Sequence, residues 1–104
     1  MKTKKKTATV DREVNDLEEL VGKKYFFRTV TYHVLGRVKR VFARHFLELE
    51  EDSWIADSGR FYNALKDGML SEIEPAGSAR EGFVNMDTVV DFYPWNHELP
   101  KEQK

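Results

Sequence analysis

The chain contains no cysteine, only three prolines and no long apolar run. Without cysteine there is no disulfide, no thiolate zinc site and no cysteine nucleophile, which fits a reducing compartment. No stretch approaches the roughly 18 apolar residues of a transmembrane helix. The lysine-rich start lacks the apolar region that a signal peptide requires. We therefore expect a cytoplasmic protein that does not enter a membrane.

Positive and negative charges nearly balance, with 17 Lys and Arg against 18 Asp and Glu. The whole-chain charge therefore does not indicate a nucleic-acid or membrane binder, and only a local patch could. Such a patch exists, because residues 23–45 hold seven Lys or Arg and no acid, whereas four of positions 48–52 are acidic. This segregation is the main indication of function.

The length of 104 residues fits one small domain. We expect residues 1–10 to be a disordered basic tail, residues 11–93 a single small barrel, and residues 94–104 an extended C-terminal tail. Residues 11–21 suit a short helix with an apolar stripe that ends before Gly22.

Residues 24–34 are rich in aromatic and β-branched residues, which predicts one strand. Alternation places Phe26, Val30, Tyr32 and Val34 on its core face. Gly36 either begins a new strand or marks a bulge in one long bent strand.

Residues 36–51 predict a hairpin around an Ala43-Arg44 turn. An even-numbered loop places Val38, Phe42, Leu47 and Leu49 on the core face. On the other face Arg37 and Lys39 then lie opposite Glu48 and Glu50, which neutralises part of the basic patch. The basic side chains without such an obvious partner are Arg28, His33, Arg40, Arg44 and His45.

The second half of the chain predicts a short helix capped by Ser58 or Asp57, burying Phe61 and Leu65 and ending at Gly68. We assign Trp54 to the core together with Phe61. Residues 71–74 suit a short strand, and residues 83–93 suit a last strand whose period breaks near Asp87.

This order of elements, together with Gly36, Val38, Val41, Leu47 and Leu49 at matching places of the first signature, resembles the Sm-like small barrel. The resemblance implies a mainly β fold: a small, strongly bent five-stranded Sm/SH3-like barrel with a short N-terminal helix and a short helix in the long connection. It also implies a homo-oligomeric ring.

The chain departs from the family's nucleic-acid site. Phe42 stands in place of its Asp, Phe46 in place of its Asn, and residues 85–88 lack the Arg-Gly of the second signature. The family's uridine pocket is therefore not carried over. Arg44 and His45 still occupy the turn that in Sm rings faces the central pore, where basic or aromatic side chains stack on bases.

A second resemblance concerns residues 54–61 and 93–100, which look like a group of small proteins carried by phages and prophages. It implies a genetic context and no activity; if the protein is phage-encoded, we expect it in the host cell cytoplasm.

No catalytic, metal or cofactor site is predicted, since His33, His45 and His97 have no ligand spacing and no nucleotide or nucleophile motif occurs. Arg60 after Ser58-Gly59 could help hold a phosphate at a helix start, although pairing with Asp57 is the simpler reading.

We therefore expect a non-enzymatic, phage-type oligomeric protein that holds an anionic ligand, a nucleotide signal or single-stranded nucleic acid, and that in a phage would counter host defence. The candidate ligand-binding residues are Arg44, His45, Arg40, Arg28, His33 and Arg60. The alternative is a structural or assembly protein of a phage particle, docking through its tail.

Overall fold

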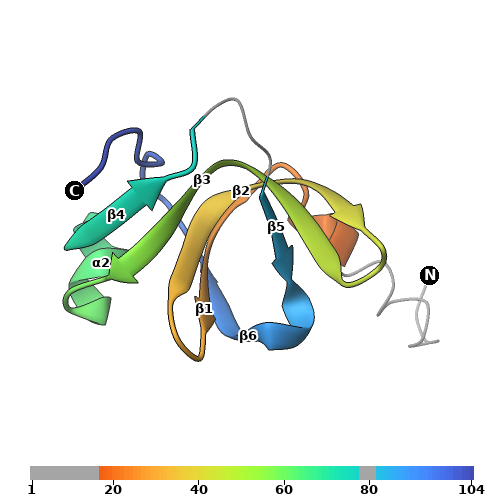
Figure 1. Ribbon diagram of the computed structural model, residues 1–104, viewed down its shortest axis with the longest axis horizontal. Coiled ribbons are helices and arrows are strands. Elements are labelled where there is room, and N and C mark those ends of the chain that lie inside the picture. Colours follow the sequence, from red (N-terminus) through yellow and green to blue (C-terminus); the bar gives the residue numbers. More distant parts are fainter. Residues whose placement is uncertain (1–16, 78–81) are drawn as a thin grey trace, which may run out of the picture.

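A computed structural model describes residues 17–77 and 82–104, which form a strongly bent antiparallel sheet with short helical segments (Figure 1). The predicted basic tail and the first part of the predicted helix at 11–21 lie outside the described residues. In chain order the elements are η1 (Leu17–Leu20), β1 (Lys24–Thr29), β2 (His33–Phe42), β3 (Phe46–Asp57), α2 (Phe61–Asp67), β4 (Glu72–Pro75), β5 (Gly82–Asn85), η2 (Met86–Thr88) and β6 (Val89–Pro94).

The sheet has six strands where five were predicted, in the order β4-β3-β2-β1-β6, with β5 also paired to β3. The first half of β3 pairs with β5 and the second half with β4. The predicted last strand is divided into β5 and β6 by the 3-10 turn η2, where the Asn85 side chain accepts a hydrogen bond from the Asp87 N–H. This turn carries the chain from the β3 side of the sheet to the β1 side (Figure 1).

Gly36 lies inside β2 at a shift of register against β3, so the bulge interpretation of this glycine is the right one. A Cβ at Gly36 would lie 3.0 Å from the Cβ of Asp52. Opposite it, Glu51 has a positive φ of 53°. The two irregularities together let β2 and β3 bend without losing their pairing.

The prediction of one strand over residues 24–34 is wrong, because the chain reverses between β1 and β2. The turn is closed by Thr29, whose N–H donates to the Tyr32 carbonyl at 3.1 Å and whose hydroxyl accepts from the Tyr32 N–H at 3.2 Å. Val30 is 87% exposed at the tip. The turn contains no glycine or proline, so composition gave no sign of it.

Two hydrophobic clusters lie on opposite faces of β1. Phe26 belongs to one cluster with Leu35, Ile55 and Trp95, covered by α2 and the C-terminal segment. Alternate residues of β1 enter the other cluster, which fills the curved inside of the sheet: Tyr25, Phe27, Val38, Leu47, Leu49 and Val84.

The helix α2 is where the sequence predicts it, but neither Ser58 nor Asp57 caps it. Arg60 is the N-cap residue and contributes no side-chain hydrogen bond. The Asp57 carboxylate instead accepts from the Gly59 N–H at 2.8 Å. At the other end Gly68 has a φ of 72° and packs against the His97 ring, so a side chain there would be both strained and obstructed.

The C-terminal segment packs on its own domain. Trp95 and Leu99 are buried, and the Trp95 ring stacks on Phe26 at 5.9 Å. The main chain of Lys104 exchanges two hydrogen bonds with Ile73 on the outer edge of β4.

Candidate nucleic-acid interface

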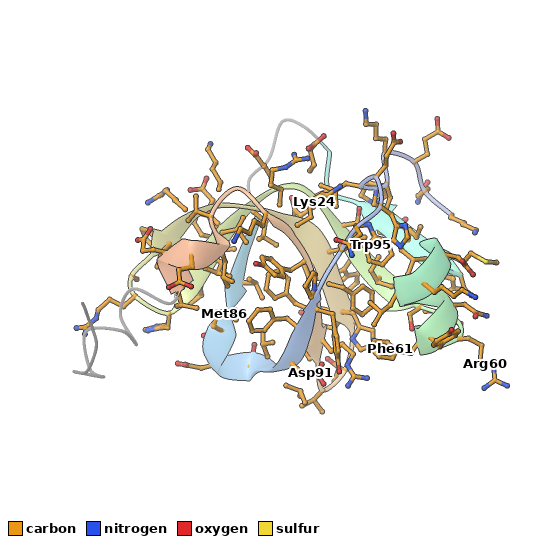
Figure 2. The ribbon with its side chains drawn as sticks, turned by 180° about the vertical axis from the view of Figure 1, so that it is seen from behind. Lys24, Arg60, Phe61, Met86, Asp91 and Trp95 are labelled. Atoms are coloured by element: carbon orange, nitrogen blue, oxygen red, sulfur yellow. The ribbon has the colours of Figure 1, made fainter. Side chains whose placement is uncertain are left out.

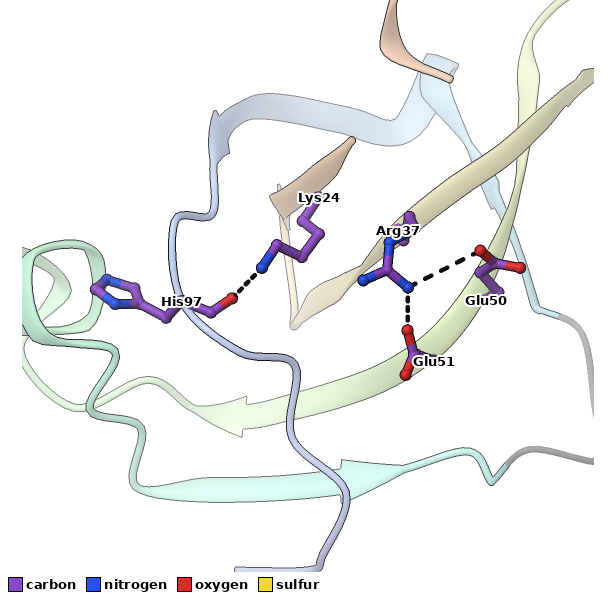
Figure 3. Close-up of polar contacts among 5 residues, drawn as sticks. All are labelled: Lys24, Arg37, Glu50, Glu51 and His97. Carbon is purple, nitrogen blue, oxygen red and sulfur yellow. Dashed lines mark hydrogen bonds and ion pairs between the residues drawn. The ribbon is translucent and has the colours of Figure 1, made fainter. Parts of the chain in front are cut away.

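Most of the predicted basic patch is neutralised within the fold. Lys24 donates to the His97 carbonyl at 2.5 Å, and Arg37 pairs with Glu51 and, at 3.9 Å, with Glu50 (Figure 3). Lys39 approaches the buried Glu48 carboxylate at 3.9 Å. The predicted pairing across β2 and β3 is therefore confirmed.

Arg28 and Arg40, which had no obvious partner in the sequence, both have one. Arg40 pairs with the Glu48 carboxylate, which is 2% exposed and lies near both Arg40 and Lys39. Arg28 forms a two-bond pair with Asp91 at 2.6 and 2.5 Å. The hydrogen bond from Arg28 lowers the pKa of Asp91, and the same bond raises the pKa of Arg28.

Arg28 also lies over the Phe61 ring at 4.5 Å and over the Tyr93 ring at 5.8 Å. His33 is its cross-strand neighbour and packs on Phe26 at 5.4 Å, with a buried Nδ1 that finds no partner within residues 17–77 and 82–104. Figure 2 shows Asp91 near Phe61, at the lower side of the sheet. This end of β2 is therefore packed and charge-balanced.

The opposite end of β2 is different. The loop 43–45 holds Ala43 and Arg44 at positive φ values of 52° and 72°, a conformation that costs L-residues about 1 kcal/mol or more. The His45 N–H donates to Ala43 at 2.8 Å, and the His45 carbonyl accepts from Met86 at 2.8 Å. Arg44 and His45 are both exposed, and in the described part of the chain no ion pair joins either of them.

Two phenylalanines lie beside this loop on the outer surface. Phe42 is 45% exposed and Phe83 is 46% exposed, with ring centroids 5.4 Å apart. The Arg40 guanidinium lies 5.0 Å from the Phe42 ring. We call Arg40, Phe42, Arg44, His45 and Phe83 the turn patch.

The prediction that Phe42 faces the core is wrong. A shift of register between Val38 and Arg40 places Val41 opposite Leu47, and the loop has three residues rather than two. Val41 therefore packs on the inner cluster and Phe42 turns outward. The sequence did not identify Phe42 and Phe83 as site residues. The alternation of apolar and polar residues along a strand indicates neither the bulge in β2 nor the contact between these two rings.

Arg60 belongs to neither end of β2. It precedes α2, and its side chain points away from the sheet (Figure 2). The candidate residues thus separate into three places: Arg40, Arg44 and His45 together, Arg28 and His33 together, and Arg60 alone.

Among the residues that the structure describes, no group of three or more His, Asp and Glu side chains could hold a metal ion. No described helix is long and apolar enough to cross a bilayer.

No family model and no curated protein matches the sequence. Solved structures similar to this chain include two heptamers. One is the SmAP1 heptamer of P. aerophilum, with a TM-score of 0.51 and 17% identity, covering 86% of this chain and 96% of that one. The other is a heptameric archaeal Sm protein, with a TM-score of 0.48 and 16% identity, covering 76% of this chain and 94% of that one.

The likeness to SmAP1 shows that this chain has the Sm-like fold, as the order of its elements predicted. No comparison supports the resemblance to phage proteins.

Proposed function

We propose that this chain is a non-enzymatic, homo-oligomeric binding protein whose turn patch holds a nucleotide or a short single strand of nucleic acid. The observation that carries the proposal is the pair of exposed rings, Phe42 and Phe83, next to the loop that holds Arg44, whose side chain forms no ion pair within residues 17–77 and 82–104. Stacking on aromatic faces together with positive charge is how proteins bind unpaired bases and their phosphates.

The strained loop supports the same conclusion. Arg44 occupies a left-handed backbone conformation that glycine would adopt without steric cost. An arginine at this position therefore lowers the free energy of unfolding relative to a glycine. Such strain is concentrated at functional sites. His45 adds a second group that can stack or donate to phosphate.

Oligomerisation would gather several turn patches around one ligand. Within the described residues β5 pairs only with β3, and β6 pairs only with β1, so each leaves an edge for another copy. The edge strand β6 exposes Val90 to 64%. The similar SmAP1 structure is a heptamer, which supports a ring of this chain and closure of each sheet into a barrel.

The ligand should be short. Arg28, Arg37, Lys39 and Arg40 are each matched by a carboxylate, so the surface of the described residues lacks the long basic stripe of a duplex binder. A nucleotide-sized ligand needs only a few converging groups. In a phage setting such a protein would sequester a host nucleotide signal.

The test is fluorescence anisotropy with labelled ten-residue single strands of RNA and DNA, and competition by mononucleotides, over a range of salt. We expect binding that weakens as salt rises, because phosphate contacts release counterions. Absence of binding to every probe at low salt contradicts the proposal.

An assembly role in a phage particle has less support. Residues 94–104 were its proposed docking arm, yet Trp95 and Leu99 are buried in their own domain and Lys104 is paired with Ile73.

A further inference from the structure

A second site lies between β4 and β5, where the two strands separate along β3. A cavity of about 370 Å³ opens there, and its lining includes Tyr32, Val34, Asp52, Trp54 and Glu74. The pairing register places Val34, Trp54 and Glu74 in one row across β2, β3 and β4, so all three share one face of the sheet. We call this cavity the aromatic cleft.

Trp54 and Tyr32 form one wall of the aromatic cleft. Their ring centroids are 4.5 Å apart and their planes meet at 60°, so they make a corner rather than a flat stack. The assignment of Trp54 to the core is wrong, since this side chain is 51% exposed, and Tyr32 is 39% exposed. Large aromatic surface left open at a cavity is a common mark of a binding site.

The charged side chains that the structure describes in the lining, Asp52 and Glu74, are acidic. Within residues 17–77 and 82–104 no ion pair joins either of them to a cation. Glu74 accepts a hydrogen bond from the neutral amide of Gln103. The Oδ1 atom of Asp52 is buried without a partner among the described residues, and burial raises the pKa of this carboxyl.

We propose that the aromatic cleft binds an organic cation, an alkylammonium group that contacts the Trp54 and Tyr32 rings and is neutralised by Glu74 and Asp52. Aromatic faces attract cations through the ring quadrupole, and carboxylates supply the matching charge. A phosphate would be repelled by the same lining. The site is therefore distinct in its chemistry from the turn patch, although the two adjoin at Phe83.

The alkylammonium could belong to a small molecule or to the methylated lysine side chain of a partner protein. The probes are choline, a short peptide with one trimethyl-lysine, and 3,3-dimethylbutan-1-ol, which has nearly the shape of choline without its charge. Binding to the full chain is measured by calorimetry. We expect choline or the peptide to bind at least tenfold more tightly than the neutral alcohol, and the preferred probe identifies the source.

Four variants locate the site. Trp54→Ala should weaken cation binding at least tenfold and Glu74→Gln about threefold, with Trp54→Phe retaining most of it. Tyr62→Ala, on α2 and also exposed, is the matched control that should change nothing. Equal binding of the neutral alcohol, or no binding of any cation at millimolar concentration, overturns the proposal.

Failure of this proposal is distinguishable from failure of the proposed function. Arg44→Glu should weaken oligonucleotide binding roughly thirtyfold and leave cation binding intact. Competition between choline and a nucleotide for one site would overturn the assignment of separate ligands.

Discussion

The two ends of β2 carry the same kinds of side chain and use them differently. At the β1–β2 end, Arg28 is held by Asp91 and by the Phe61 ring, and His33 is packed on Phe26. At the β2–β3 end, Arg44 and His45 are exposed on a strained loop beside two open rings. An arginine next to aromatic rings is therefore not by itself a binding site: Arg28 is neutralised by Asp91, whereas Arg44 has no carboxylate partner among the described residues.

The largest expected effect is on ligand binding at the β2–β3 end, where the turn patch lies. Arg44→Glu should lower affinity for a single-stranded oligonucleotide by about 2 kcal/mol, roughly thirtyfold, because a charge-assisted contact is lost and repulsion added. Anisotropy titration measures it. The thermal midpoint of the variant should not fall, since the Arg44 side chain makes no ion pair in the described structure.

Stacking of a base on the turn patch should make the next largest contribution to oligonucleotide affinity. Phe42→Ala should weaken binding by about 1–2 kcal/mol, roughly tenfold, because each base stacked on an aromatic ring contributes about that much. Tyr62→Ala removes a more exposed ring far along the chain and serves as the control in the same titration. If both variants bind as the wild type does, Phe42 takes no part in recognition.

A substitution at the β1–β2 end should lower stability and leave ligand affinity unchanged. Arg28→Ala should lower the thermal midpoint by about 4–8 °C, since the cation–π contact with Phe61 alone contributes about 1 kcal/mol. Oligonucleotide affinity should stay unchanged. A loss of affinity equal to that of Arg44→Glu would erase the contrast between the two ends.

Relief of loop strain sharpens the comparison. Arg44→Gly should stabilise the protein by about 1 kcal/mol, because glycine adopts a φ of 72° without steric cost, and should weaken binding. Chemical denaturation measures the first effect and anisotropy the second. A destabilised Arg44→Gly variant would show that the Arg44 side chain supports the fold.

The smallest effects are those of pH. The pKa of Asp91 is lowered in the folded state by Arg28, so this carboxylate stabilises the fold above its ordinary pKa, and the contribution is lost as pH falls through the lowered value. The pKa of Asp52 is raised by burial, so its contribution to stability is present at low pH and is lost as pH rises through the raised value. Asp52→Asn should therefore raise the thermal midpoint at pH 7 but not at pH 3, and Asp91→Asn should lower it at pH 7 only. Thermal scans at the two pH values measure both.

Features of the fold that depend on neighbouring residues could be predicted from the sequence. The bend at Gly36, the helix that ends at Gly68 and the pairing of Arg37 with Glu50 follow from glycine, alternation and cross-strand charge. The turn after Thr29 was missed because a threonine side chain closes it in place of glycine or proline.

The site was harder to predict, because its members are brought together by tertiary contacts. Arg28 and its partner Asp91 are 63 positions apart, and Phe42 meets Phe83 from a different strand. A single shift of register turned Phe42 out of the core. The positive residues were visible in the sequence, whereas the pairing of Arg28 with Asp91 was not.

The most direct test of the account is native mass spectrometry of the full chain mixed with a ten-residue single-stranded oligonucleotide. We predict a closed oligomer that carries the oligonucleotide, and an Arg44→Glu oligomer of the same subunit number that carries much less of it at the same oligonucleotide concentration. A monomer, or an Arg44→Glu oligomer that carries as much oligonucleotide as the wild type does, would contradict the assignment of the turn patch as the binding surface.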